Sequence, residues 1–389
     1  MSKFSVRALF LISVCLLLVA CSGLGPRLLP ASRMDYNVSV DRSNNEEMLL
    51  NLVRLKYFET PVFLQVGSIA SVYSLGFDAS MGADIPDQRD FGLGVYTRFA
   101  PNISTSYSDN PTVTYTPYQG QNFAQQVLTE LDFERLALLY RGGWEIEHLI
   151  PIFVYRIGGL THDFDSRRGF NPERHKRFME ATEIIGKMDD DGNLDIVTTA
   201  DPKAAEKDAG KAKDKDSSDG DVPKITIVQL RFNDKAEAAH LGALLGFDFK
   251  THPGNGGKLI AKVRLVTATD FDQRPSDSDR YQEMPLRLRN LFRAMDLLAL
   301  GVDVPEKDLA AKKTFSSLAQ KMGLLDIRCA SSRPSKAFVA VKHGDFWFYI
   351  ADDDTDSKEI FQLLLAVFAI QASDLSKNAP ILTLPVGGQ

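Results

Sequence analysis

The sequence predicts an α+β fold in which antiparallel-rich sheets pack with helices, preceded by a cleaved signal peptide and a flexible tether. Runs of alternating branched and aromatic residues are interspersed with runs whose apolar residues recur at helical spacing. Three closely spaced strand patterns, LDIRCAS, KAFVAVKH and DFWFYIAD, precede a very apolar helix. With 44% hydrophobic residues, the chain of 389 residues can bury one large core or two modest ones.

Residues 1–20 have the pattern of a signal peptide. Lys3 and Arg7 form a basic start, and the apolar run that follows holds about a dozen residues, whereas a membrane-spanning helix needs roughly 20. The run ends in a sequence that resembles a bacterial lipobox, read by the lipoprotein signal peptidase, at Leu18, Val19, Ala20 and Cys21. The Cys21 thiol is then the lipid acceptor. The competing interpretation is an ordinary signal peptide in which this cysteine is incidental.

The resemblance also implies where the lipidated protein resides. Ser22 follows the cysteine, and in Gram-negative lipoproteins the absence of aspartate there is typical of transfer to the outer membrane. We therefore expect an outer-membrane protein that faces the periplasm. Residues 21–42 contain two prolines and two glycines without a sustained period, and they are expected to form the lipidated N-terminus and a tether.

The N-terminal α+β region is predicted over residues 43–199. Ser43 and Glu46 have the spacing of a capping box, which predicts a helix over 44–57. Short alternating runs follow, the last two joined across Asp109-Asn110-Pro111, and they predict a small antiparallel meander. Helical patterns then extend to a helix over 172–188, and GNLDIVTT is typical of a strand.

Residues 200–222 are predicted to be a disordered charged insertion, because lysines and acids without large apolar side chains cannot offset the entropy of ordering. A C-terminal α+β region, 223–389, alternates strands and helices, one of them predicted in PLRLRNLFRAMDLLALG. The insertion separates either two independent domains or, as we favour, two adjacent strands of one hairpin, LDIVTT and ITIVQL. A very apolar segment, Ile360–Ile370, is too short to span a bilayer and is expected to be a buried helix.

Charge and cysteine content argue against a nucleic-acid partner, a disulfide and a cysteine nucleophile. The net charge of −6 provides no electrostatic footprint for nucleic acid, so no nucleic-acid partner is expected. Once the signal peptide is removed and Cys21 is lipidated, Cys329 stands alone and has no disulfide partner. It lies in a strand pattern, which favours an inert thiol over a nucleophile.

Acidic and histidine clusters suggest metal chemistry but have simpler explanations. Candidate ligands for a hard cation precede the last apolar helix at Asp352, Asp354 and Asp356, where capping of the helix is the favoured interpretation. A run from Asp189 to Asp195 fits a turn better than a calcium loop. A group of mixed ligand types, for which a polar loop is a sufficient explanation, comprises His162, Asp163, Asp165 and His175. We therefore predict no metal and no cofactor.

Two sets of residues favour binding over catalysis. Aromatic residues in the meander would form an adhesive surface if they share an exposed face, and would otherwise pack beneath helices; they are Tyr96, Tyr107, Tyr115 and Tyr118. Three arginines near residues 285–300 could meet an anionic partner, or could form a solvated helix face; they are Arg287, Arg289 and Arg293. A glycine-rich segment, PGNGGK, lacks the residues of a phosphate-binding loop and predicts a hairpin connection.

Several segments resemble a widespread group of bacterial lipoproteins that has no assigned activity. These segments are NEEMLLNLVRLKYFETPVFLQVGSI, NPTVTYTPYQGQNF, WFYIADDDTDSKEIFQLL and LTLPVGG. The resemblance implies a lipoprotein and implies no catalytic residue. We therefore expect a lipid-anchored envelope protein that binds another envelope component, most plausibly a protein, as a scaffold or assembly factor. The alternative class is a periplasmic hydrolase of cell-wall or polysaccharide material that would use Asp352 and Asp356.

Overall fold

The computed structural model describes most of the chain, namely residues 24–84, 98–118, 124, 127–162, 171–200, 224–267, 281–318, 322–372 and 382–385. Contacts divide the chain into two units. The first unit comprises Met1–Pro61 and Gly120–Asp374, and the second comprises Val62–Gln119 and Leu375–Gln389. These units do not coincide with the predicted regions 43–199 and 223–389, because strands of both regions share one sheet in the first unit.

Seven strands form the larger sheet of the first unit, in the order β4-β3-β9-β8-β6-β5 with β7 paired to β8. Among these pairs only β8 and β9 run parallel, which confirms the antiparallel-rich α+β class. The strands are β3 (Val154–Ile157), β4 (Leu160–Thr161), β5 (Leu194–Ala200), β6 (Lys224–Phe232), β7 (His252–Pro253), β8 (Leu259–Val266) and β9 (Gln282–Leu288).

The pairing of β5 with β6 settles how the charged segment is connected. The register runs from Leu194 opposite Leu230 to Ala200 opposite Lys224, so these two strands are neighbours in one sheet. The favoured prediction of one hairpin is confirmed, and the alternative of two independent domains is wrong. Residues 201–223 lie outside the described residues.

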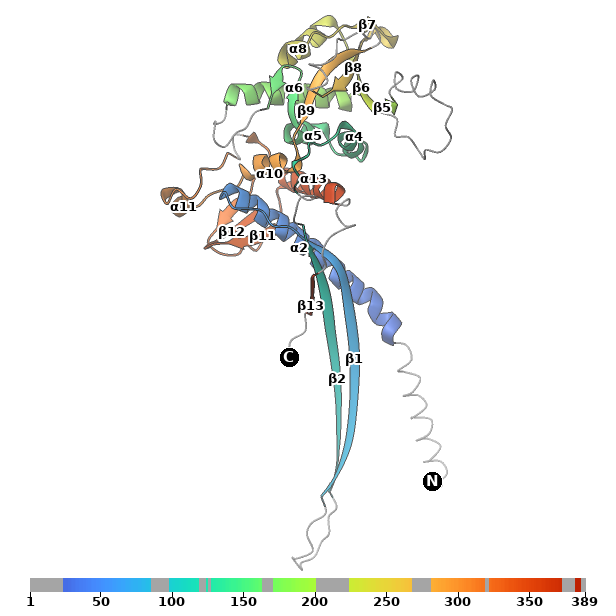
Figure 1. Cartoon of the computed structure of the whole chain (residues 1–389), viewed down its shortest axis with the longest axis vertical. Helices are drawn as coiled ribbons and strands as arrows, with labels where there is room; N and C mark the ends of the chain where they lie inside the picture. Colours follow the sequence, from blue (N-terminus) through green and yellow to red (C-terminus); the bar gives the residue numbers. More distant parts are fainter. Residues whose placement is uncertain are drawn as a thin grey trace, which may run out of the picture. The chain divides into compact units, whose positions relative to one another are not determined.

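Four helices pack with this sheet (Figure 1), and their ends follow local sequence signals. The side chain of Asn171 caps one of them by accepting from the Arg174 amide, and Gly246 ends another with φ of 60°. The four are α4 (Phe133–Arg141), α5 (Ile146–Phe153), α6 (Pro172–Asp190) and α8 (Lys235–Leu245). The predicted turn after α6 is confirmed, since Gly192 has φ of 67° and the Asn193 amide bonds to the Met188 carbonyl.

A smaller sheet in the same unit has the strand order β10-β12-β11. Its strands are β10 (Arg328–Ala330), β11 (Ala337–His343) and β12 (Phe346–Ala351). The accompanying helices are α2 (Leu24–Lys56), α10 (Leu291–Ala299), α11 (Glu306–Ala310) and α13 (Thr355–Ala372). Helix α13 is buried along one side through Ile360, Phe361 and Leu364, so it is a core helix as predicted. Among the described residues, no helix has both the length and the apolar character needed to cross a membrane.

Helix α2 corrects the predicted tether over 21–42, because the structure is helical from Leu24 onward. Arg42 Nε lies 2.9 Å from Glu46 Oε1, an i,i+4 pair that supports a helix by local contacts. Glu46 therefore pairs with Arg42 and does not close a capping box at Ser43. The apolar face begins only later, at Met48 and the buried leucines that follow it.

The structure also corrects the prediction of a helix that begins at Pro285. Strand β9 continues to Leu288, and α10 begins after Asn290, whose side chain accepts from the Arg293 amide at 2.8 Å. Met284, Leu286 and Leu288 are buried at a period of two, which is the strand pattern that the helical interpretation overlooked.

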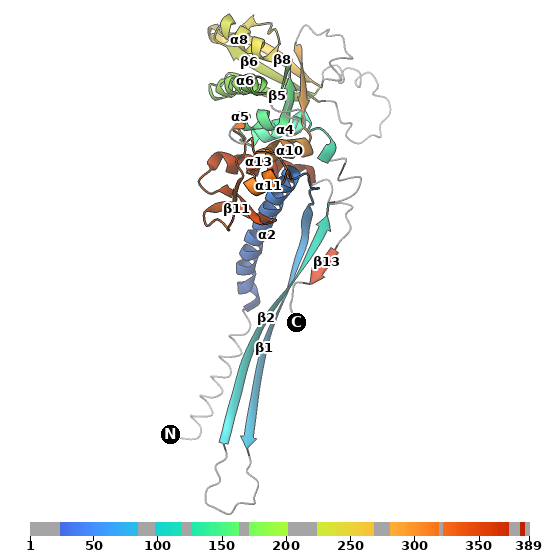
Figure 2. The same ribbon diagram turned by 90° about the vertical axis from the view of Figure 1, so that its left-hand side faces the viewer.

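The second unit is a long hairpin rather than the predicted small meander (Figures 1 and 2). Its strands are β1 (Leu64–Asp84), β2 (Arg98–Pro117) and β13 (Leu382–Pro385), in the order β1-β2-β13. The turn predicted at Asp109-Asn110-Pro111 is wrong, because these residues pair with Tyr73, Val72 and Ser71 within one continuous ladder. Strand β1 is long enough to pair with β2 through these three residues. A local turn signal carries no information about the length of the partner strand.

One buried cation joins α2 to the loop after α10. The Lys56 ammonium donates to the carbonyls of Leu300 at 3.3 Å and Ser316 at 3.2 Å, and lies 4.0 Å from the centre of the Phe315 ring. Its side chain is buried, and burial lowers the pKa of Lys56 from 10.5 to about 8, although the charge of Asp303 opposes the shift.

This pKa predicts a specific dependence of stability on pH. Between pH 8 and 10.5 the folded state loses the Lys56 proton while the unfolded state keeps it, so this residue makes the free energy of unfolding rise with pH. The free energy of unfolding of the wild type, minus that of Lys56→Met, should therefore rise across this window by about 3 kcal/mol. Urea titrations at several pH values measure it, with Lys342→Met as a control for loss of charge. A difference that does not vary with pH would contradict the buried cation.

Candidate functional site

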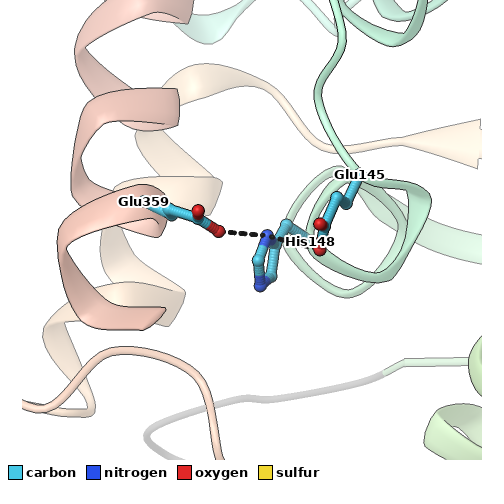
Figure 3. Close-up of side chains that lie close together, drawn as sticks. All are labelled: Glu145, His148 and Glu359. Atoms are coloured by element: carbon cyan, nitrogen blue, oxygen red, sulfur yellow. Dashed lines mark ion pairs between the residues drawn. The ribbon is translucent and has the colours of Figure 1, made fainter. Parts of the chain in front are cut away.

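The described residues bring together one group of three metal-ligating side chains, Glu145, His148 and Glu359 (Figure 3). Glu145 is the residue before α5, and its carboxylate makes no capping hydrogen bond. His148 lies one turn later on α5, and Glu359 projects from α13. The site thus depends on two helices that are far apart in the sequence.

The histidine ring lies between the two carboxylates. His148 Nδ1 is 3.8 Å from Glu145 Oε2 and 3.6 Å from Glu359 Oε2. The side chain of His148 is 18% exposed, whereas those of Glu145 and Glu359 are 66% and 57% exposed. The neighbouring Glu147 lies elsewhere, because its carboxylate sits against the backbone of Gly186 on α6. The group is therefore accessible to an ion from solvent.

Imidazole and carboxylate are both ligand types that zinc uses in proteins, and in open sites three such ligands leave the fourth position to a water. The three ligand atoms lie within 4.8 Å of one another. Ligand atoms around a tetrahedral zinc are about 3.3 Å apart, given zinc–ligand distances of about 2.0 Å. Rotation of the two exposed glutamates could close this difference. Without an ion, the same atoms form weak, solvent-screened ion pairs.

A thermal-shift titration distinguishes these two states. Zinc should raise the melting temperature of the wild type, by an amount corresponding to about 2.7 kcal/mol when its concentration is about 100 times Kd. His148→Gln should abolish the increase. His240→Gln is the matched control, because His240 also pairs with a glutamate, Glu180 at 3.4 Å, without belonging to a group of three ligands. Equal zinc stabilisation of both variants would rule out this metal site.

The sequence analysis did not identify this group. Its only local signal is the i,i+3 spacing of Glu145 and His148, which places both residues on one side of a helix. Glu359 comes from a segment 211 positions after His148, and only the packing of α13 near α5 brings it close.

A second cluster surrounds the buried guanidinium of Arg289, which is 6% exposed and follows β9. Arg289 Nη1 donates to three carbonyls at the end of α5, those of Pro151 at 3.0 Å, Ile152 at 3.0 Å and Val154 at 2.8 Å. Nη2 donates to the carbonyl of His162 and lies 3.2 Å from Nδ1 of the same residue. A planar group with five donors suits this convergent set of acceptors.

Two histidines extend the cluster towards α6. His162 Nε2 lies 3.1 Å from His175 Nδ1, and the His162 ring stacks on Phe178 at 4.2 Å between centroids. Burial, with the charge of Arg289 and the proximity of His175, holds the pKa of His162 well below its usual range; burial also lowers the pKa of His175. Both rings are therefore neutral near pH 7, next to a single buried cation.

This cluster is a structural connection between α5, β9 and α6. The predicted mixed-ligand group is partly brought together, since His162 and His175 are in contact, whereas Asp163 and Asp165 lie outside the described residues. The contact does not favour a metal, because the two ring nitrogens that face each other are hydrogen-bonded and leave no space for an ion between them.

The three candidate arginines do not form one surface, so the predicted arginine helix face is wrong. Arg289 is buried in the cluster just described. Arg287 lies on β9, where its Nε is 2.9 Å from Glu130 Oε1. Arg293 is exposed on α10. Arg287 is an exposed residue of β9, whereas Arg289 follows the end of that strand at Leu288 and lies in the buried turn before α10.

The candidate tyrosines are distributed differently from one another. Tyr107 and Tyr115 lie on β2 eight positions apart and therefore share one face of that strand. Tyr115 is partly exposed and Tyr118, after the strand, is buried. Tyr96 lies outside the described residues.

The acidic residues before α13 act largely as a helix cap. Asp354 Oδ1 accepts from the Ser357 amide at 3.1 Å, which confirms the favoured interpretation. Asp352 Oδ1 lies 3.1 Å from Lys358 Nζ, and Asp356 accepts from the Thr355 hydroxyl at 3.3 Å. Among the described residues, these three carboxylates belong to no group of three metal ligands.

Two further predictions concern placement in the fold, and both are confirmed. Cys329 lies on β10 as predicted, and burial, followed by the charge of Asp303, raises the pKa of its thiol to about 12. The glycine-rich segment forms a connection between β7 and β8 through a short 3-10 turn, η2 (Asn255–Gly257).

An apolar cavity of about 100 Å³ lies between the larger sheet and its helices. Its lining includes Leu136 and Leu149 from helices, and Ile196, Val228 and Met284 from strands. A cavity of about 150 Å³ holds one benzene molecule, so this smaller volume does not accommodate an acyl chain.

No family model, curated protein or solved structure matches the chain. The resemblance to the lipoprotein group therefore stays a prediction. The lipobox residues on which it partly depends, Leu18, Val19, Ala20 and Cys21, lie outside the described residues.

Proposed function

We propose that the chain is a lipid-anchored cell-envelope protein that binds another envelope protein as a scaffold or assembly component. The anchor is Cys21, and the outer membrane facing the periplasm is the proposed location. The lipobox pattern at residues 18–21 and Ser22 support this location.

The single observation that carries the binding role is the open edge of the second unit. Strand β1 pairs with β2 on one side, and among the described residues no strand pairs with its other side from Gln65 to Asp84. An exposed strand edge offers a row of backbone donors and acceptors, to which a partner can add a strand. The edge strand contains no lysine or proline, the residues that commonly protect such edges.

The hydrolase alternative receives less support. A hydrolase would gather acids, histidine and convergent polar groups in a cleft. The described residues gather three such groups only at Glu145, His148 and Glu359, and Asp352 is paired with Lys358. The zinc titration above examines that possibility independently of the binding role.

Site-specific photocrosslinking in intact cells tests the proposal. A photoreactive residue in place of Ala70, which is exposed on β1, should give one discrete adduct with an envelope protein. The same residue in place of Leu138, which is 57% exposed on α4, is the control and should give none. Absence of an adduct from Ala70, or adducts of equal yield at both positions, would contradict strand-edge binding.

A further inference from the structure

The hairpin of β1 and β2 has two chemically different faces. Because the ladder is antiparallel and continuous from Ser68 to Asp84, residues that face one another across the strands lie on the same face, and alternate residues lie on opposite faces. A ribbon of about 20 paired residues is roughly 65 Å long at about 3.3 Å per residue. Two strands alone are marginally stable in water, so a hairpin of this length needs additional strands or another surface to pack against.

One face is apolar over a defined length. This face consists of alternate residues of β1 between Tyr73 and Asp84 and of the β2 residues opposite them. All of them are apolar or aromatic except Thr105. The register positions that define this apolar face are occupied by Leu75, Phe77, Met81, Phe99, Ile103 and Tyr107. The opposite face carries no apolar residue larger than alanine over the same length. It is defined by Ser74, Ser80, Asn102, Ser104, Ser106 and Ser108.

The ends of this apolar stretch are marked by charge. Tyr73 lies opposite Asp109 at one end, and Asp84 lies opposite Arg98 at the other. Within the stretch, the only charged residue of either strand is Asp78, which lies on the serine-rich face opposite Ser104. Each strand therefore contributes ten residues, 74–83 or 99–108. A tilted strand needs about 9–11 residues to cross the hydrocarbon core of a bilayer.

Two residues of the serine-rich face, Ser104 and Ser106, are exposed. Where β13 joins the ladder, beyond the charged end at Asp109, Leu382 and Leu384 lie opposite Tyr115 and Val113. Aromatic residues at Tyr73, Tyr107 and Phe99 lie near the two ends of the apolar stretch, where such side chains match a membrane–water interface.

The open edges of the hairpin need hydrogen-bond partners if the hairpin enters a bilayer. Within the described residues, a second strand pairs with β2 only over Thr112–Tyr115, and no second strand pairs with β1. Backbone groups left unpaired in hydrocarbon cost several kcal/mol each, so one hairpin alone is not stable there. Lipid cannot supply hydrogen bonds to these edges, whereas the hairpin of another copy can, since it has the same length and the same two faces.

We propose that the hairpins of several copies of this chain pair edge to edge within a lipid bilayer, with the Leu75–Ile103 face against hydrocarbon and the serine-rich face away from it. The inference rests on the proposed function, because the lipid on Cys21 brings each copy to the membrane. It deepens that function by naming the partner of the open β1 edge as a second copy.

Fluorescence in vesicles tests insertion. The full lipidated chain with Cys329→Ser is reconstituted into vesicles of phosphatidylethanolamine and phosphatidylglycerol, with an environment-sensitive probe at Ile103→Cys or at Ser104→Cys. These adjacent residues lie on opposite faces. The probe at 103 should show severalfold higher emission and be quenched by spin-labelled acyl chains, whereas the probe at 104 should show neither effect.

Crosslinking tests the pairing of copies. One chain carries Gly76→Cys on β1 and a second carries Ser106→Cys on β2, positions that face one another within one hairpin, and the two chains are mixed. Oxidation in vesicles should give disulfide dimers between the two single-cysteine chains. Ile103→Asp should reduce their yield severalfold, and Ser104→Asp should leave it unchanged.

Two results separate this inference from the proposed function. If the lipidated chain floats with the vesicles while probes at 103 and 104 both remain in water, the insertion of the hairpin is wrong and the lipid anchor stands. If the chain does not float, the anchor itself is wrong. Dimers that form equally well without vesicles would also overturn assembly in the bilayer.

Discussion

Arg289→Met should lower the free energy of unfolding by about 3 kcal/mol or more. The substitution removes the donors of the carbonyls of Pro151, Ile152 and Val154, which are buried with the guanidinium. A buried polar group left without a partner costs about 1–3 kcal/mol, and several lose theirs at once. Methionine has a similar length but no donor, so the change isolates hydrogen bonding from packing.

Urea unfolding followed by circular dichroism measures this change. The control is Arg287→Met, two residues earlier, where the side chain is 54% exposed and pairs with Glu130. An exposed ion pair contributes about 0–1 kcal/mol, so the control should be nearly neutral. Arg289→Lys should fall between the two, because an ammonium has three donors and lacks the planar fork. Equal effects of the two methionine variants would show that the buried cluster does not stabilise the fold.

Cys21→Ser should abolish membrane association almost completely. Only the thiol of this residue can accept the diacylglyceryl group if the lipobox prediction is right, and a hydroxyl does not replace it in this reaction. Incorporation of labelled fatty acid should be lost, and the chain should leave the membrane fraction. Cys329→Ser is the matched control, since its thiol lies on β10 and should not affect labelling. Normal labelling of Cys21→Ser would end the lipoprotein hypothesis.

Local patterns predicted the elements that depend on neighbours in the sequence. The hairpin of β5 and β6 and the cap at Asp354 were both predictable, because alternation and capping are set by a few consecutive residues. Helix α2 was predicted too short because its first part is held by pairs such as Arg42–Glu46 rather than by an apolar face.

Features set by distant parts of the chain were not predictable. The burial of Arg289 depends on three carbonyls at the end of α5, which no pattern around residue 289 indicates. Glu359 joins His148 only through the packing of two helices. The length of the β1–β2 hairpin depends on pairing across the whole ladder, which overrides the local turn signal at Asp109-Asn110-Pro111.

Lipid anchoring is the claim on which both the proposed function and the hairpin inference depend. The intact mass of the chain extracted from membranes, with fragmentation of its first peptide, tests it most directly. The account predicts a chain that begins at Cys21 and carries a diacylglyceryl group on the sulfur of that residue. A mature chain that begins at any other residue, or a Cys21 with a free thiol, would contradict it.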